Sequence, residues 1–149
     1  MRSAALFLAA LALAGCGPKP DALEDLDTRT VTLPGGRQVR AEVLINPQDL
    51  ARGMMFRDSL APDRGMLFLH REAGEYPYWM YQVRIPLDMI WMDSQRRVVE
   101  IAANAAPCQT EPGQCPTYGG HHRAQYVLEL SPVGLLMAPH LKGNRLEGA

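Results

Sequence analysis

Apolar and polar residues alternate in short runs along most of this chain, and turn residues separate the runs. In residues 39–45 valine, alanine and isoleucine alternate with arginine, glutamate and Leu44, which is the period of a half-buried strand. Residues 30–33 precede this run across Pro34-Gly35-Gly36, so the two runs predict a β-hairpin. Further apolar runs between turn residues predict strands at 65–69, 78–81, 87–92, 97–101 and 126–130. About seven short strands are typical of a sandwich or barrel, and the predicted fold class is mainly β.

One short helix interrupts this pattern near residues 47–53. Asn46 is a favourable N-cap, and Pro47 suits the first helical position. Asp49 favours the positive N-terminal end of the helix dipole, and Gly53 weakens the helix one turn later. The sequence therefore predicts a single short helix between strands.

The N-terminus reads as an export signal. Arg2 precedes an apolar run over residues 4–14, which is shorter than the roughly 20 residues that a membrane-spanning helix needs. The run ends in Leu13-Ala14-Gly15-Cys16, which resembles the lipobox of bacterial lipoproteins. We therefore expect residues 1–15 to be a signal peptide and Cys16 to carry the lipid. The alternative is an ordinary signal peptide that contains a cysteine.

A lipid on Cys16 would place the chain in the cell envelope. Gly17 rather than aspartate follows the cysteine, and by resemblance to the lipoprotein class this favours the periplasmic face of the outer membrane in a Gram-negative cell. Residues 16–28 then form the lipidated cysteine and a tether. Residues 29–149 form one β-rich domain, because 149 residues leave little room for a second.

Charge argues against a nucleic-acid partner. The formal net charge is −1, and removal of residues 1–15 would take away Arg2 and no acidic residue. The exported part is therefore slightly acidic, whereas nucleic-acid binding needs clustered lysine and arginine. The expected contacts are the membrane, through the lipid, and either a small ligand or an envelope protein.

Two further cysteines, Cys108 and Cys115, lie in a loop with proline at both ends. An even pair in an oxidising compartment predicts a disulfide, which would stabilise the fold by about 2–3 kcal/mol. The alternative is a metal site that also uses His121 and His122. It is disfavoured because adjacent histidines point apart on a strand and no CxxC spacing is present, so we expect no metal and no cofactor.

Five short motifs occur in order along the chain. They are Arg52-Gly53-Met54-Met55-Phe56-Arg57, Gly65-Met66-Leu67-Phe68, Trp79-Met80, Ile85-Pro86-Leu87-Asp88 and Val127-Leu128-Glu129-Leu130. This series resembles the bacterial and archaeal family called domain of unknown function 192. The likeness covers roughly residues 30 to 146 and implies a compact, mostly β domain of sandwich or barrel type, often exported or lipid-anchored, without an established activity.

The chain departs from this family at two places. The family often continues its Trp-Met with Lys-Asn-Thr, whereas this chain has Tyr81-Gln82-Val83. Near the end, the family tends to have Gly-Asp where this chain has Gly143-Asn144. If either polar position serves a site in the family, that site is altered here.

Two carboxylates stand out among apolar neighbours. Asp88 lies in the apolar segment 85–92, where a carboxylate is costly unless it is paired. An arginine could pair with it, the candidates being Arg52, Arg57 and Arg84. Asp88 is then either a structural ion-pair partner or half of a small polar pocket. Glu129 lies between Leu128 and Leu130, and we expect it to face solvent.

No catalytic motif such as GxSxG or HExxH is present, so we lean against an enzyme. The leading hypothesis is a non-enzymatic envelope module that binds a ligand or partner in a cleft lined by Arg52, Trp79, Met80, Asp88 and Glu129. One alternative is a hydrolase of envelope polysaccharide that uses Asp88 and Glu129 as an acid/base pair. A second is copper handling by methionine thioethers, although methionines beside aromatic and aliphatic residues are more often core. The methionines concerned are Met54, Met55, Met66, Met80, Met89, Met92 and Met137.

Overall fold

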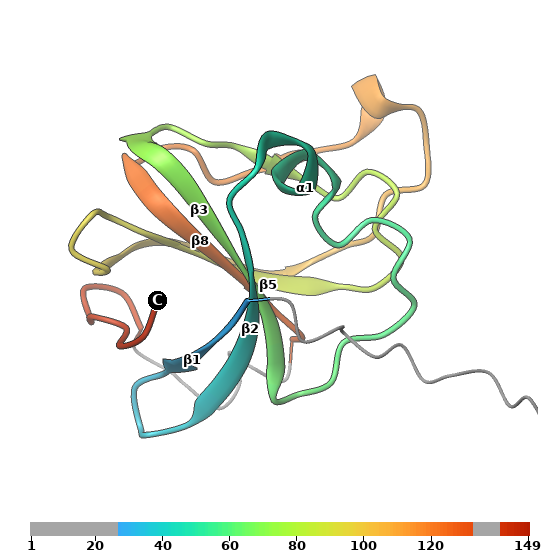
Figure 1. The fold of residues 1–149 in the computed structure, drawn as a ribbon. Helices are drawn as coiled ribbons and strands as arrows, with labels where there is room; N and C mark the ends of the chain where they lie inside the picture. Colours follow the sequence, from blue (N-terminus) through green and yellow to red (C-terminus); the bar gives the residue numbers. More distant parts are fainter. Residues whose placement is uncertain (1–26, 133–140) are drawn as a thin grey trace, which may run out of the picture.

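The computed structural model describes residues 27–132 and 141–149, and this part of the chain is mainly β (Figure 1). The predicted signal peptide, Cys16, almost all of the tether and Met137 lie outside the described residues. No helix within the described ranges is long and apolar enough to cross a membrane. The elements are β1 (Thr28–Thr32), β2 (Gln38–Leu44), α1 (Pro47–Arg52), β3 (Arg64–Gly74), β4 (Tyr78–Trp79), β5 (Leu87–Met92), β6 (Val98–Ala105), the 3₁₀ helix η1 (Pro112–Gln114), β7 (Thr117–Tyr118) and β8 (Ala124–Leu130).

Six strands form one mixed sheet in the order β1-β2-β3-β8-β5-β6, and β4 and β7 form a separate two-stranded sheet. The predicted hairpin is confirmed, because β1 pairs antiparallel with β2. β2 and β3 run parallel, joined by the crossover that contains α1, whereas the other neighbours are antiparallel. The mainly β class is thus confirmed, as one curved sheet that does not close into a barrel.

The C-terminal segment 141–149 connects the two edges of this sheet. The Thr32 N–H, on the edge strand β1, donates to the Glu147 carbonyl at 2.9 Å. The Val98 N–H, on the opposite edge strand β6, donates to the Asn144 carbonyl at 2.8 Å. Figure 1 shows the red C-terminal end in the space between β1 and the yellow turn that joins β5 to β6. The segment therefore holds the curved sheet together where a closing strand ladder is missing.

Both faces of the sheet are covered, so the protein has two apolar cores. The first, which we call the C-terminal core, includes the side chains of segment 141–149, and its buried members are Val31, Leu33, Val39, Ala41, Leu67, Ile90, Met92, Val98, Leu128, Leu130, Leu141, Leu146 and Ala149. The second, the helix-side core, lies on the other face beneath α1 and the long loops, and its buried members are Leu44, Met54, Met66, Phe68, Met80, Val83, Leu87, Met89, Trp91, Ala105, Cys108, Ala124 and Val127.

The short helix forms as the sequence predicts. The Asn46 side chain accepts a hydrogen bond from the Asp49 N–H at 2.9 Å, which caps the first turn. The helix ends at Gly53, which has a φ of 46° and donates its N–H to the Asp49 carbonyl. Leu50, on the face toward the sheet, packs against the helix-side core.

The structure differs from the predicted strands mainly between residues 70 and 82. β3 continues to Gly74, well beyond the predicted 65–69. The strand predicted at 78–81 is only the two-residue β4, which pairs with β7, an element that the pattern did not predict. The chain leaves β4 after Trp79 because the Met80 carbonyl accepts hydrogen bonds from loop N–H groups rather than from a strand partner.

Candidate functional site

The five residues predicted to line one cleft do not lie together. Arg52 ends α1 and is exposed, and Trp79 is 41% exposed. Met80, next to it, is fully buried in the helix-side core. Asp88 and Glu129 are also buried, at 1% and 4% exposure. The predicted cleft therefore separates into surface residues and interior residues.

Asp88 and Glu129 point to opposite faces of the sheet. In the pairing of β5 with β8, Asp88 is opposite Leu130 and Met89 is opposite Glu129. Successive residues of a strand point to opposite faces, so Asp88 is on the face of Leu130 and Glu129 is on the face of Met89. The sheet separates the two carboxyl groups, and the alternative of an Asp88–Glu129 acid/base pair is wrong.

Asp88 accepts a hydrogen bond where the pairing of β5 with β6 is irregular. Its Oδ1 accepts a hydrogen bond from the Asn104 N–H at 2.7 Å. The ladder between β5 and β6 shifts register next to Asp88, and Asn104 has a φ of 52°. Two of the arginines expected to pair with Asp88 have other partners, since Arg57 binds Glu42 and Arg84 binds Asp58. Asp88 therefore supplies an acceptor to a backbone N–H that the irregular ladder displaces.

Glu129 is buried, so the expectation that it faces solvent is wrong. It lies between Met66 of β3 and Met89 of β5 on the helix-side face. Its Oε2 is buried and has no hydrogen-bond partner. Burial raises the pKa of Glu129 to about 8, and the charge of Arg57 opposes this shift only in part. The carboxyl group is therefore mostly protonated at neutral pH.

An ion pair borders this buried acid. Arg57 Nη2 lies 2.7 Å from Glu42 Oε2, and both side chains are partly exposed, at 29% and 15%. Glu42 pairs in register with Met66, and Met66 pairs with Glu129. The two glutamates thus occupy one row across β2, β3 and β8, and Arg57 is the cation that acts on both.

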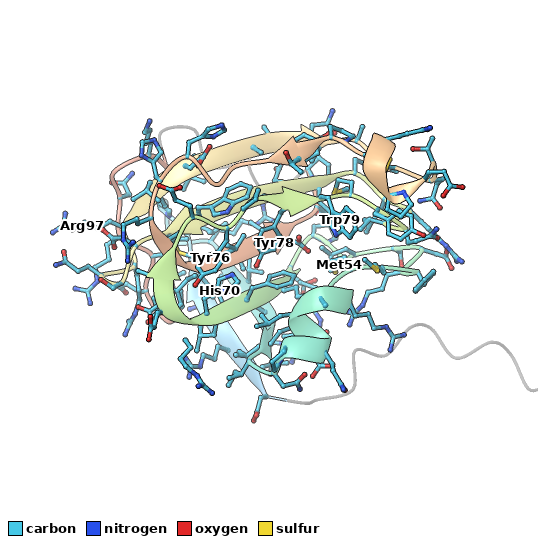
Figure 2. All side chains as sticks on the ribbon, turned by 90° about the horizontal axis from the view of Figure 1, so that it is seen from above. Met54, His70, Tyr76, Tyr78, Trp79 and Arg97 are labelled. Carbon is cyan, nitrogen blue, oxygen red and sulfur yellow. A yellow bond between two sulfur atoms is a disulfide. The ribbon has the colours of Figure 1, made fainter. Side chains whose placement is uncertain are left out.

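An aromatic surface surrounds the loop after β4. The ring centroids of Trp79 and Tyr81 are 5.2 Å apart. Phe56 is 49% exposed, and the Arg84 guanidinium lies 5.9 Å from its ring centroid. We call these four residues, Phe56, Trp79, Tyr81 and Arg84, the aromatic surface. Figure 2 shows Trp79 and Met54 toward one end of the molecule and Tyr76, Tyr78 and His70 nearer its middle.

The backbone beneath the aromatic surface is strained. Phe56 has a φ of 65° and Gln82 a φ of 57°, in the left-handed region that costs an ordinary residue roughly 1–2 kcal/mol. The Phe56 N–H donates to the Gln82 carbonyl at 2.9 Å, so the two strained positions are bonded to each other. Such strain is typical of functional segments, because the surrounding structure must maintain it.

The disulfide between Cys108 and Cys115 is present. It anchors the loop that supports the aromatic surface, because Cys108 exchanges backbone hydrogen bonds with this segment. The Cys108 N–H donates to Met80, and the Gln82 N–H donates to Cys108. Cysteines in a disulfide cannot serve as metal ligands, so the predicted metal alternative loses two of its four ligands.

The histidines and methionines offer no metal site among the described residues. His121 binds Glu100 through its ring and its backbone N–H, and the described ranges contain no group of three or more His, Cys, Asp or Glu that could hold an ion. Five of the six described methionines are buried in the two cores, as expected of packing residues. Met55 is partly exposed and is the one of these six that is not buried.

A buried aromatic cluster escaped the sequence analysis. Tyr78 packs edge-on against Phe68 and Trp91, with centroids 5.0 and 5.8 Å away, and its hydroxyl lies 3.0 Å from His70 Nε2. His70 stacks on Tyr76 at 3.6 Å. Burial lowers the pKa of His70 and raises that of Tyr78, so both side chains stay neutral near pH 7. These aromatic residues are spread over the 24 positions from Phe68 to Trp91, so no periodic pattern indicated the cluster.

Two solved structures resemble this protein along most of its length. One, from Sinorhizobium meliloti 1021, is described as a candidate transcription regulator; it is 30% identical, with a TM-score of 0.70, over 83% of this chain and 95% of that chain. The other is a protein of unknown function from Novosphingobium aromaticivorans DSM 12444, 28% identical, with a TM-score of 0.73, over 95% of this chain and 99% of that chain.

No curated protein matches the chain. A family model does, and it spans residues 30–143. This range contains the strands of the main sheet from Thr30 onward, the aromatic surface and the buried Glu129. On this match the chain belongs to the DUF192 family, described as uncharacterized ACR.

Proposed function

We propose that this protein is a non-catalytic binding module of the bacterial cell envelope that recognises a partner protein through the aromatic surface. The observation that carries the proposal is the pair of strained, hydrogen-bonded positions Phe56 and Gln82 beneath exposed aromatic rings. Maintaining two left-handed residues costs stability, and Phe56 and Trp79 still leave 49% and 41% of their surface exposed in the free protein. A partner that covers them would recover that apolar area.

The chemistry of the surface suits a protein partner. Tryptophan, tyrosine and arginine dominate the binding energy of protein interfaces, and Trp79, Tyr81 and Arg84 bring all three types together. Asp58, which binds Arg84 at 2.8 Å, adds a polar group at the edge. A rigid support also favours binding, because the disulfide loop fixes the Met80–Gln82 segment before the partner arrives.

The surface is tested by crosslinking in living cells. A photo-crosslinking residue at position 81 should give a discrete adduct with an envelope protein, and Trp79→Ala should remove that adduct. The control places the same crosslinker at Ile45, an apolar side chain outside the aromatic surface that is 61% exposed. No adduct from position 81, or the same adduct from position 45, contradicts the proposal.

The lipid anchor has a separate test. The apolar run that ends at Cys16 supports anchoring, and a disulfide is in keeping with an oxidising compartment. Cys16→Ser should move the protein from the membrane fraction to the soluble fraction of the envelope, whereas Cys115→Ser should leave it on the membrane. Retention of the Cys16→Ser chain on the membrane would remove the anchoring part of the proposal.

The description of the Sinorhizobium protein as a candidate transcription regulator does not suit the charge of this chain. The slightly acidic charge expected for residues 16–149 does not suit a phosphate backbone. A partner protein needs no basic footprint, because apolar and aromatic contacts can supply the affinity.

A further inference from the structure

Three buried polar atoms in the described ranges lack a hydrogen-bond partner, and their residues occupy neighbouring positions in the ladder of β3 and β8. They are Arg64 Nη1, Glu129 Oε2 and Ser131 Oγ. Gly65 pairs with Leu130, so Arg64, just before Gly65, and Ser131, just after Leu130, occupy facing positions at the end of this ladder. Glu129 is two residues before Ser131 and therefore shares its face. Leaving such groups unpaired costs stability, so the two unpaired atoms at the facing positions of Arg64 and Ser131 call for a ligand.

An arginine pair borders the same place. Arg40 of β2 and Arg64 of β3 are register partners in the parallel ladder, so both side chains lie on the helix-side face. Like charges in directly opposite positions repel. The ion pairs within the described ranges include neither arginine. Asp63 is exposed, and it contacts Arg40 through its backbone carbonyl, which accepts the Arg40 N–H at 2.9 Å.

We propose that Arg40, Arg64 and Ser131 form a binding site for a small oxyanion, a phosphate or a carboxylate. Guanidinium groups bind such anions through two parallel N–H donors, and the serine hydroxyl adds a second kind of donor. An anion held between the arginines relieves their repulsion and gives the unpaired Arg64 and Ser131 atoms their partners. The anion is small because both of these atoms lie inside the protein.

The neighbouring charges favour an anion over a cation. Arg40, Arg57 and Arg64 supply three positive charges to this face, and Glu42 is already bound to Arg57. Glu129 is mostly protonated at neutral pH because its pKa is about 8, and so it offers a donor rather than a negative charge. A water molecule could also meet the hydrogen bonds, but it leaves the two guanidinium charges unbalanced.

The site is independent of the proposed partner surface, since the two share no residue. It is tested on the full-length protein in detergent by calorimetric titration with inorganic phosphate, sulfate and acetate at low ionic strength. Saturable one-to-one binding is expected for at least one of these anions. Arg64→Gln should weaken it about tenfold and Ser131→Ala about threefold, as for loss of a charged and of a neutral hydrogen bond.

Arg29→Gln is the matched control. Arg29 pairs with Ala41 on the neighbouring strand, so it belongs to the opposite sheet face, and its substitution changes the net charge by the same amount. The Arg29→Gln variant should bind the anion with the same affinity as the unmodified chain. Absence of saturable binding, or equal weakening in Arg29→Gln and Arg64→Gln, overturns the proposal. Ser131→Ala keeps the charge and nearly the volume, so it decides the matter if Arg64→Gln fails to fold.

Discussion

The most unusual residue of this protein is the buried acid Glu129. A carboxyl group that is 4% exposed, with one oxygen unpaired, destabilises the folded state whenever it must be ionised. Arg57, whose charge acts on Glu129, is already bound to Glu42. The protein therefore accommodates Glu129 by keeping it protonated, which makes stability depend on pH.

The direction of that dependence follows from the raised pKa. The folded state holds the Glu129 proton up to a pKa of about 8, whereas the unfolded chain releases it near the ordinary pKa of 4.5 for a glutamate. Between these values the folded state binds more protons, so the free energy of unfolding falls as pH rises. Glu129→Gln should remove this slope and stabilise the protein by about 2–4 kcal/mol at a pH near 8.

Urea denaturation across this pH range measures the effect. Glu111→Gln, a change of the same size at an exposed position, should keep the slope of the unmodified protein. Equal pH profiles for Glu129→Gln and the unmodified chain would mean that Glu129 gains a partner in solution.

At the scale of elements, local sequence signals predicted what local chemistry controls. The hairpin, the capped helix and most strands of the main sheet followed from alternation and turn residues, because each depends on neighbours in sequence. The parallel pairing of β2 with β3 and the pairing of β4 with β7 did not, because they join segments far apart in the chain. A pattern of one or a few residues does not indicate which distant strand a segment will pair with.

The candidate site was predicted less well for a related reason. Glu129 was expected to face solvent because strand residues alternate, but this sheet is covered on both faces. Alternate residues of a strand then enter two different apolar cores, instead of one core and the solvent. Trp79, which the sequence analysis singled out, is exposed. Phe56 was not singled out, because its exposure depends on a left-handed backbone that no residue type there signals.

The disulfide loop is the element that supports the aromatic surface. Replacing both Cys108 and Cys115 by serine should lower the free energy of unfolding by about 2–3 kcal/mol, because the short closed loop no longer restricts the unfolded chain. The amide protons of Gln82 and Cys108, which are bonded across this loop, should also exchange faster. Their exchange relative to that of β8 amides separates local loosening from global destabilisation, and unchanged rates would show that the loop needs no disulfide.

The whole molecule depends on a short segment at the C-terminal end of the described chain. Residues 141–149 bond to both edges of the sheet and bury Leu141, Leu146 and Ala149 in the C-terminal core. Gly148 is its tightest point, because a Cβ atom there would lie 2.0 Å from the Thr30 carbonyl oxygen. That approach fixes the segment against β1.

Gly148→Ala should therefore destabilise the entire fold, although the residue lies near one end of the chain. The segment must move away from β1, and we expect a loss of about 2 kcal/mol or more in the free energy of unfolding. Gly143→Ala is the control, because Gly143 has nearly the same φ, 85° against 83°, and nothing within 4 Å of its added Cβ. Gly143→Ala should lower the free energy of unfolding by only about 1 kcal/mol, which is the cost of a non-glycine residue in a left-handed backbone conformation. Equal losses in the two variants would mean that contact with β1 does not hold the sheet edges together.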